Sequence, residues 1–364
     1  MKAAVYHGIG DVRVEERDTP RIGAGELLVR VRACAICGGD LRTLRYGHPK
    51  IHPPVILGHE FAGIVVEAGA DVSQDFMGVH VVAAPAVGCG ECAYCRAGHT
   101  HLCGHRETIG FSMDGAFAEY VRIPARAVRL GNVQRIPDDV DDLAAALTEP
   151  LACVVNGQEA LGIGTGETVA VIGAGPIGIL HAELARAAGA RVLLLNRSAQ
   201  RLADVRDMGY DSYIETGADG GVQAVLDVTD GRGADVVIVT AGSAAAMAAG
   251  IAMTARMGRV SLFAGLPQGA TPFPLDVNLV HYRQIGLYGA FSSAPRHNAR
   301  ALSLIRSGQV RVARILTHAV ALTNIAHGFD LVECRTGLRV LVLPNMEEMA
   351  AAIARHSHIT AVKE

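Results

Sequence analysis

The stretch Thr168-Val169-Ala170-Val171-Ile172-Gly173-Ala174-Gly175-Pro176-Ile177-Gly178 decides the fold of the central part of this chain. A largely apolar run leads into the glycines and a helical run over 179–188 follows them, so the stretch predicts a strand, a tight turn and a helix. This is the context that a dinucleotide-binding fingerprint requires. The first glycine permits the turn, the second lets the backbone approach a pyrophosphate, and the third lets helix and strand pack closely. We therefore predict a nucleotide site built from Gly173, Ala174, Gly175, Pro176, Ile177 and Gly178, with the pyrophosphate at the helix N-terminus.

The residues after this stretch alternate between strand and helix patterns. Strands are expected at 191–195, 234–240, 259–264 and 284–288, with helical segments at 201–208, 222–229 and 244–254 between them. Such alternation predicts an α/β fold with a doubly wound parallel sheet. Residues 1–36 and 61–87 instead alternate as short strands, which predicts a small twisted β unit. After residue 291 we expect a helix at 298–307, strands at 319–322 and 338–342, and a polar tail after Pro344.

Four cysteines follow the spacing C-x2-C-x2-C-x7-C, at Cys89, Cys92, Cys95 and Cys103. Four thiolates on one compact loop can fill a zinc tetrahedron and leave no position for water, which predicts a closed structural zinc site. Four unrelated free thiols in so short a segment are an improbable alternative. The neighbouring His99, His101 and His105 are surplus to four-coordination, so we expect them to be exposed.

A second set of metal-binding residue types is spread along the chain. Cys37 comes first, the pair His59-Glu60 follows, and Glu149 stands before Pro150 at the end of a helix expected over 139–147. Thiolate, imidazole and carboxylate together suit zinc, and three protein ligands with an open fourth position are typical of a catalytic site. Such a zinc would act as a Lewis acid.

Asp40 has two interpretations. It can cap the N-terminus of a helix over 41–46, or it can accept a hydrogen bond from the far nitrogen of His59, as carboxylates do for zinc-bound histidines. Cys34 is expected to be a small buried hydrophobe rather than a ligand. His80 lies among apolar residues and is expected in the core.

Composition excludes several classes of function. A chain of 364 residues is too long for one hydrophobic core and predicts two domains. A formal net charge of −3 without a Lys/Arg block argues against nucleic acid or a membrane surface as a partner. The N-terminal segment lacks a signal-peptide pattern, and no apolar run is long enough to span a bilayer. Eight cysteines, four of them clustered, fit metal ligands in a reducing compartment, so we expect a cytoplasmic globular protein.

The chain resembles the zinc-dependent medium-chain dehydrogenases in the order of its motifs, which run from Cys37 through Gly58-His59-Glu60 and the four cysteines to Glu149-Pro150-Leu151 and the glycine loop. The similarity is greatest to the branch of polyol, threonine and sugar-phosphate dehydrogenases. It implies a GroES-like zinc catalytic domain over 1–150 and 291–364, and a Rossmann dinucleotide-binding domain over 151–290. It also implies a homodimer or homotetramer that associates through the edge strand at about 284–288.

The same resemblance implies roles for further residues. Cys37, His59 and either Glu60 or Glu149 would hold a catalytic zinc, and the four clustered cysteines would hold a second zinc. By position, the nicotinamide would be lined by Thr240, Ala241, Ala264, Gly265 and Leu266, and Arg339 would reach the pyrophosphate.

The implied reaction is hydride transfer between a secondary alcohol, such as a polyol, a sugar alcohol or a sugar derivative, and NAD or NADP. Three alternatives keep the same fold: a non-catalytic nucleotide-sensing protein, a ketone reductase working mainly in the reducing direction, and a zinc-independent quinone or enoyl reductase. The presence of Cys37, His59, Glu60 and Glu149 disfavours the first and the third.

Two positions depart from the pattern of many relatives. Gly39 replaces the Ser or Thr whose hydroxyl begins a proton relay. Asn196 replaces the acidic residue that ends the second Rossmann strand and repels a 2′-phosphate. Arg197 and Arg201 follow, and guanidinium groups bind phosphate well, so we predict that NADP is at least competitive with NAD.

Overall fold

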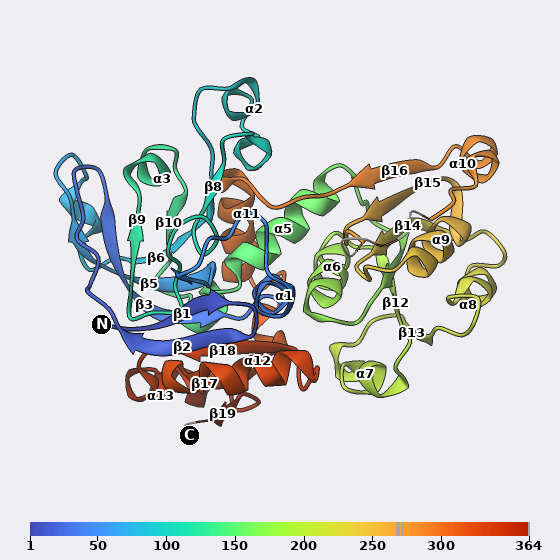
Figure 1. The fold of residues 1–364 in the computed structure, drawn as a ribbon. Coiled ribbons are helices and arrows are strands. Elements are labelled where there is room, and N and C mark those ends of the chain that lie inside the picture. Colours follow the sequence, from blue (N-terminus) through green and yellow to red (C-terminus); the bar gives the residue numbers. More distant parts are fainter. Residues whose placement is uncertain (267–269, 271–272, 363–364) are drawn as a thin grey trace. The chain divides into compact units, whose positions relative to one another are not determined.

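The computed structural model describes residues 1–266, 270 and 273–362, which form two compact units. The first unit comprises residues 1–152 and 292–364, and the second comprises residues 153–291. In Figure 1 the first unit carries the blue and red ends of the chain, and the second carries the yellow-green to orange part. None of the helices in these described ranges has the length and apolarity that a membrane span requires.

The first unit is dominated by an eight-stranded mixed sheet with the order β10-β6-β5-β3-β18-β17-β19, in which β9 also pairs with β3. A three-stranded sheet, β2-β1-β4, and a two-stranded sheet, β7-β8, accompany it. The strands are β1 (Lys2–Gly8), β2 (Asp11–Glu16), β3 (Leu27–Ala35), β4 (Val55–Ile56), β5 (Glu60–Ala68), β6 (His80–Ala83), β7 (Ala86–Val87), β8 (Glu107–Thr108), β9 (Tyr120–Ile123), β10 (Val133–Arg135), β17 (Leu316–Ala321), β18 (Arg339–Leu343) and β19 (Thr360–Val362). The helices are α1 (Gly38–Tyr46), α2 (Ala93–Arg96), α3 (Ala125–Arg129), α4 (Asp142–Ala145), α11 (Pro295–Arg306), α12 (Ile325–Glu333) and α13 (Met346–Arg355).

The core of this unit is aliphatic, with Phe117 and Phe329 packed edge to face at 6.1 Å between ring centres. Cys34 is fully buried in it, which confirms the prediction of a small buried hydrophobe. The expectation for His80 was wrong. Its side chain is 44% exposed and its Nδ1 lies 2.8 Å from Asp142, because it stands at the start of β6, where apolar neighbours in sequence do not mean burial.

The expectation of a polar tail after Pro344 was also wrong, because Met346–Arg355 forms the helix α13 and Thr360–Val362 forms the strand β19. Asn345 caps α13 by accepting the backbone N–H of Glu348 at 3.1 Å, and Met349 is buried. The strand β19 then pairs in parallel with β17. Glu348 anchors the helix through Arg30 at 2.7 Å. The segment therefore extends the main sheet of the first unit by one strand.

The second unit is a six-stranded parallel sheet with the order β13-β12-β11-β14-β15-β16, in which every strand pairing is parallel. This confirms the predicted doubly wound α/β architecture. The elements are β11 (Thr168–Ile172), α6 (Pro176–Ala187), β12 (Arg191–Asn196), α7 (Ala199–Ala203), β13 (Ser212–Glu215), α8 (Val222–Val228), β14 (Ala234–Val239), α9 (Ala244–Ala252), β15 (Thr254–Leu262), α10 (Val277–Arg283) and β16 (Gly286–Gly289). The helix α5 (Thr148–Glu159) contributes residues to both units.

Candidate metal centres and nucleotide site

Three predicted metal ligands meet where β3 and β5 lie side by side. Ala35 pairs with Glu60 across these strands, and Cys37 follows as the N-cap of α1. One ligand atom from each of Cys37, His59 and Glu60 lies within 4.8 Å of the other two. The chain can turn into β5 because Gly58 has φ +93°, and a Cβ there would lie 2.8 Å from Phe117 and 2.9 Å from the Cys34 sulfur.

The buried polar atoms of this group fit a cation. His59 is 6% exposed and Glu60 is 1% exposed. Within the described residues, the Glu60 Oε2 atom is buried and accepts no hydrogen bond. Burial raises the pKa of Glu60 to about 7, and the positive charge of Arg339 opposes that rise. A divalent ion beside a thiolate, an imidazole and this carboxylate would satisfy the orphaned oxygen and keep it ionised.

Asp40 contacts two members of the group. Its Oδ2 accepts the backbone N–H of Cys37 at 2.9 Å, and its Oδ1 lies 3.4 Å from His59 Nδ1. The prediction that Asp40 is an N-cap was wrong, because Cys37 is the N-cap and Asp40 is the third helical residue of a capping box. Its alternative role, beside the far nitrogen of His59, agrees with this placement.

Arg339 lies beside Glu60, a pairing that was not predicted from the sequence. The guanidinium is 4% exposed; it donates to Glu60 Oε1 at 3.0 Å and to the Ile36 carbonyl at 3.0 Å. Two of its hydrogen bonds are therefore used within the first unit. The buried carboxylate needs a cation and Arg339 supplies it. The expectation that Arg339 also reaches a pyrophosphate stays a prediction.

Glu149 is buried at 9% exposure in the first turn of α5. The expectation that it ends a helix was wrong, since Pro150 is tolerated in a first helical turn and α5 continues beyond it. Its charge raises the pKa of Glu60 less than burial does, so the two carboxylates lie within electrostatic reach. Among the described residues, the compact ligand group contains Glu60 and not Glu149.

Phe111 forms a wall beside the metal group. Its ring centre lies 5.1 Å from that of His59 and 5.5 Å from that of His48. A Cβ at Gly39 would lie 3.9 Å from the Phe111 ring and 3.6 Å from the Cys37 sulfur. Position 39 thus has room for a side chain but offers no hydroxyl.

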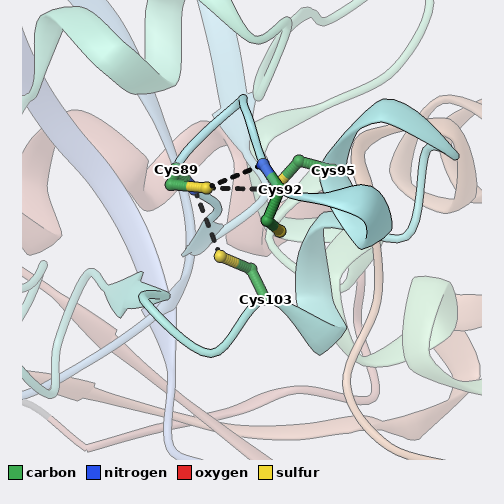
Figure 2. Close-up of side chains that lie close together, drawn as sticks. All are labelled: Cys89, Cys92, Cys95 and Cys103. Carbon is green, nitrogen blue, oxygen red and sulfur yellow. Dashed lines mark hydrogen bonds between the residues drawn. The ribbon is translucent and has the colours of Figure 1, made fainter.

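The four-cysteine loop forms the second candidate centre, shown in Figure 2. One sulfur from each of Cys89, Cys92, Cys95 and Cys103 lies within 4.8 Å of the others. Cys89 Sγ accepts the backbone N–H groups of Glu91 at 3.4 Å and Cys92 at 3.3 Å (Figure 2 draws the second). These bonds lower the pKa of Cys89 to about 6, which favours the thiolate that binds metal. The donor set and its closure fit a structural zinc.

The histidines near this loop correct one expectation. His101 is 3% exposed, and its ring centre lies 5.7 Å from that of His297 on α11. Burial, followed by the charge of His297, lowers the pKa of His101 to about 4. It is buried because the loop packs against α11, a contact between residues distant in sequence. His105 is exposed, as predicted.

The glycine loop in the second unit has the geometry that each glycine was expected to provide. Gly173 has φ +117°, and a Cβ at Gly178 would lie 1.7 Å from the Gly173 carbonyl oxygen. A Cβ at Gly175 would meet nothing within 4 Å, so that face of the loop is open to a ligand. Thr240 Oγ1 donates to the Ile172 carbonyl at 3.0 Å and thereby fixes the loop against β14.

Several other predicted cofactor residues lie at the same edge of the sheet. Ala241 follows β14, and residues 264–266 follow β15, so both segments stand at carboxyl ends of parallel strands. A Cβ at Gly242 would lie 2.8 Å from the Gly265 carbonyl oxygen, which places the two loops together. Asn196 ends β12, and its Oδ1 accepts the Ala174 backbone N–H at 3.4 Å.

Comparison with known proteins agrees with this geometry. Residues 23–134 match the model of the alcohol dehydrogenase GroES-like domain, and residues 176–307 match that of the zinc-binding dehydrogenases. The chain is 32% identical to the sorbitol dehydrogenase of Halalkalibacterium halodurans, over 94% of this chain and 99% of that protein. It is 33% identical to the L-threonine 3-dehydrogenase of Bacillus subtilis, over 89% and 93% of the two chains.

A solved zinc-binding dehydrogenase of Sinorhizobium meliloti, bound to NADP, is 34% identical, with a TM-score of 0.86 and coverage of 94% of this chain and 99% of that one. The chain therefore belongs to the zinc-dependent medium-chain dehydrogenases, a class of oxidoreductases that act on alcohols with NAD(P). Within the class it falls on the polyol branch.

Proposed function

We propose that the protein oxidises a secondary alcohol of a polyol or sugar-derived substrate with NAD(P), at a zinc ion held by Cys37, His59 and Glu60. The observation that carries the proposal is the buried group of three ligand types, with one orphaned carboxylate oxygen, in a chain of this family. When bound, zinc supplies Lewis acidity toward the alcohol or carbonyl oxygen, and the nicotinamide exchanges the hydride.

The residues of the chain orient these groups. Asp40 Oδ1 lies 3.4 Å from His59 Nδ1, so its carboxylate favours a proton on that nitrogen and leaves Nε2 as the ligand atom. Arg339 favours the charged form of Glu60 and restricts its rotation through their hydrogen bond. Phe111 excludes water from one side of His59. Gly39 has no hydroxyl, so the proton leaves through water held by Glu60 or Glu149, or through a hydroxyl of the substrate.

Both cofactors are expected to bind, with NADP at least competitive with NAD. Asn196 carries no charge at the end of β12, and Arg197 beside it is exposed. The NADP complex of the 34% identical relative supports this expectation.

A homodimer or homotetramer is proposed through the edge of the six-stranded sheet. Within the described chain, β16 is an end strand of that sheet. Exposed apolar side chains lie on neighbouring elements, with Met257 75%, Val277 67% and Tyr282 71% exposed. The grouping of Cys89, Cys92, Cys95 and Cys103 as one set of metal-ligand thiols supports a reducing compartment such as the cytoplasm.

The test is turnover of sorbitol, other polyols, L-threonine and simple secondary alcohols with NAD and with NADP. The zinc-loaded protein should oxidise at least one of them, lose that activity on chelation and regain it when zinc is restored. Turnover that survives removal of the metal would point to a zinc-independent reductase. Nucleotide binding without turnover of any alcohol or ketone would point to a sensor.

A further inference from the structure

Two exposed cations near the metal group, Arg42 on α1 and Lys50, form no ion pair with any residue that the structure describes. Arg45 differs from them, because its guanidinium pairs with both carboxylate oxygens of Glu333, with Nε at 2.8 Å from Oε1. Its charge is therefore satisfied within the protein. Arg42 and Lys50 are the basic residues of this surface that remain available to a ligand.

His48 lies between these cations and the metal group. Its ring packs edge to face on Phe111 at 5.5 Å, and Phe111 packs on the metal ligand His59 at 5.1 Å. Arg42 and Lys50 both act on His48: after burial, their positive charges are the causes that lower its pKa. Two ring contacts thus connect the cationic surface to the place where an alcohol would react.

The hydrogen bonding of His48 determines what it can bind. The backbone N–H of Lys50 donates to His48 Nδ1 at 3.2 Å, so the neutral ring carries its proton on Nε2. Burial and the charges of Lys50 and Arg42 lower the pKa of His48, which favours the neutral ring. His48, Arg42 and Lys50 therefore offer hydrogen-bond donors to a ligand. A hydroxyl chain both donates and accepts, whereas a phosphate monoester or a carboxylate presents acceptors.

We propose that Arg42, His48 and Lys50 form an anion-binding subsite beside Phe111, which recognises the phosphate or carboxylate group of a charged polyol substrate. The inference rests on the proposed alcohol oxidation and narrows its substrate class. The anionic group would sit on the solvent side of Phe111, and the alcohol to be oxidised would lie on the His59 side. A short polyol chain would connect them past the ring edge.

The experiment compares matched substrates with the zinc-loaded protein and its preferred cofactor. The pairs are sorbitol against sorbitol 6-phosphate, and sorbitol against gluconate, each assayed in the wild type, in the double variant Arg42→Gln/Lys50→Gln and in Arg45→Gln. Arg45→Gln is the matched control, since it removes one positive charge from the same helix where that charge is already paired. Inorganic phosphate is added as a competing probe against sorbitol.

The wild type is expected to prefer an anionic member by at least about tenfold in kcat/KM, the discrimination that one charge-assisted hydrogen bond can supply. The double variant should lower that ratio about tenfold, and Arg45→Gln should leave it close to wild type. Preference for the phosphate ester or for the carboxylate identifies the anion. Inorganic phosphate should inhibit the wild type more strongly than the double variant.

Equal turnover of neutral and anionic substrates, with phosphate inhibition unchanged in the double variant, would overturn the subsite and leave the alcohol oxidation intact. No turnover of any alcohol by the zinc-loaded protein would overturn the proposed function and the subsite with it. Should the double variant fold poorly, the substrate ratio of the wild type still decides, because a protein without the subsite would not prefer the anionic member. Phosphate inhibition counts for the subsite only where phosphate competes with sorbitol and not with the cofactor, whose pyrophosphate is expected at the glycine loop.

Discussion

Replacing Arg339 with methionine would leave the Glu60 carboxylate without the guanidinium that lies 3.0 Å from its Oε1. The side chains are 5% and 1% exposed, so water does not reach the charge that remains. Breaking a buried ion pair by removing one partner destabilises a protein by about 3–5 kcal/mol. For a unit of this size, that loss corresponds to a decrease in Tm of about 6–20 °C.

The assay is scanning calorimetry of the zinc-loaded protein at pH 7.5, with Arg30→Met as the matched control. Arg30 also pairs with a glutamate, Glu348, but these side chains are 34% and 38% exposed. An exposed pair contributes about 0–1 kcal/mol, so the control should melt close to the wild type. Zinc retention and KM should change in Arg339→Met and not in Arg30→Met, because only Arg339 contacts a metal ligand of the described group.

Glu60 is also a proposed zinc ligand, so the rescue is measured in the Cys37→Ser background, which is expected to lack that zinc: there, adding Glu60→Gln to Arg339→Met removes the unpaired charge and should recover part of the lost stability. The reasoning is refuted if Arg339→Met melts within about 2 °C of the Arg30→Met control. It is also refuted if the double variant Arg339→Met/Glu60→Gln loses more stability than Arg339→Met and Glu60→Gln lose together.

Three further predictions each concern one or two residues. His181 is fully buried, and burial lowers its pKa to about 3, so between pH 6.5 and 3 the unfolded chain binds a proton that the folded chain does not. The contribution of His181 to stability is therefore complete above pH 6.5 and should fall by about 2 kcal/mol between pH 7 and pH 5. Denaturation curves at the two pH values should show this loss in the wild type and not in His181→Gln. Asp40→Asn keeps an oxygen for the Cys37 backbone N–H but loses the charge beside His59, so competition with a chelator should show about 10–100-fold weaker zinc binding without loss of α1. Asn196→Asp should raise kcat/KM for NAD relative to NADP, and Arg197→Ala should lower kcat/KM for NADP. If the NAD/NADP ratio of kcat/KM is equal in the wild type and both variants, neither side chain interacts with the 2′-position.

The parts of the molecule that the sequence predicted well are formed by residues that lie close together in the chain. The glycine loop lies within eleven residues between one strand and one helix, and the four cysteines lie on one loop, so turn geometry and ligand spacing determine both. Cys37, His59 and Glu60 were also predictable, because the residue types suit one metal even though the chain must fold to bring them together.

The contacts that the sequence did not reveal join residues far apart in the chain. Arg339 and Glu60 are 279 positions apart, and no local pattern relates them. A signal did exist, since a buried carboxylate requires a cation and few arginines lie in apolar strands such as β18. His101 and α13 illustrate the same point, because the partner surface that buries each becomes visible in the folded unit alone. Of the two interpretations of Asp40, the N-cap failed by three positions because a cysteine, which is rarely expected to cap a helix, precedes α1.

The central claim is that the Cys37/His59/Glu60 centre is catalytic and the four-cysteine centre is structural. Zinc content measured together with turnover tests it most directly. The wild type should contain about two zinc ions per chain, and Cys37→Ser and Cys92→Ser about one each. Cys37→Ser should lose turnover while keeping the wild-type Tm to within a few degrees. Cys92→Ser should lose stability first, because metal binding is part of the folding energy of that loop. A wild type with one zinc, or a Cys37→Ser variant that retains turnover, would contradict the account.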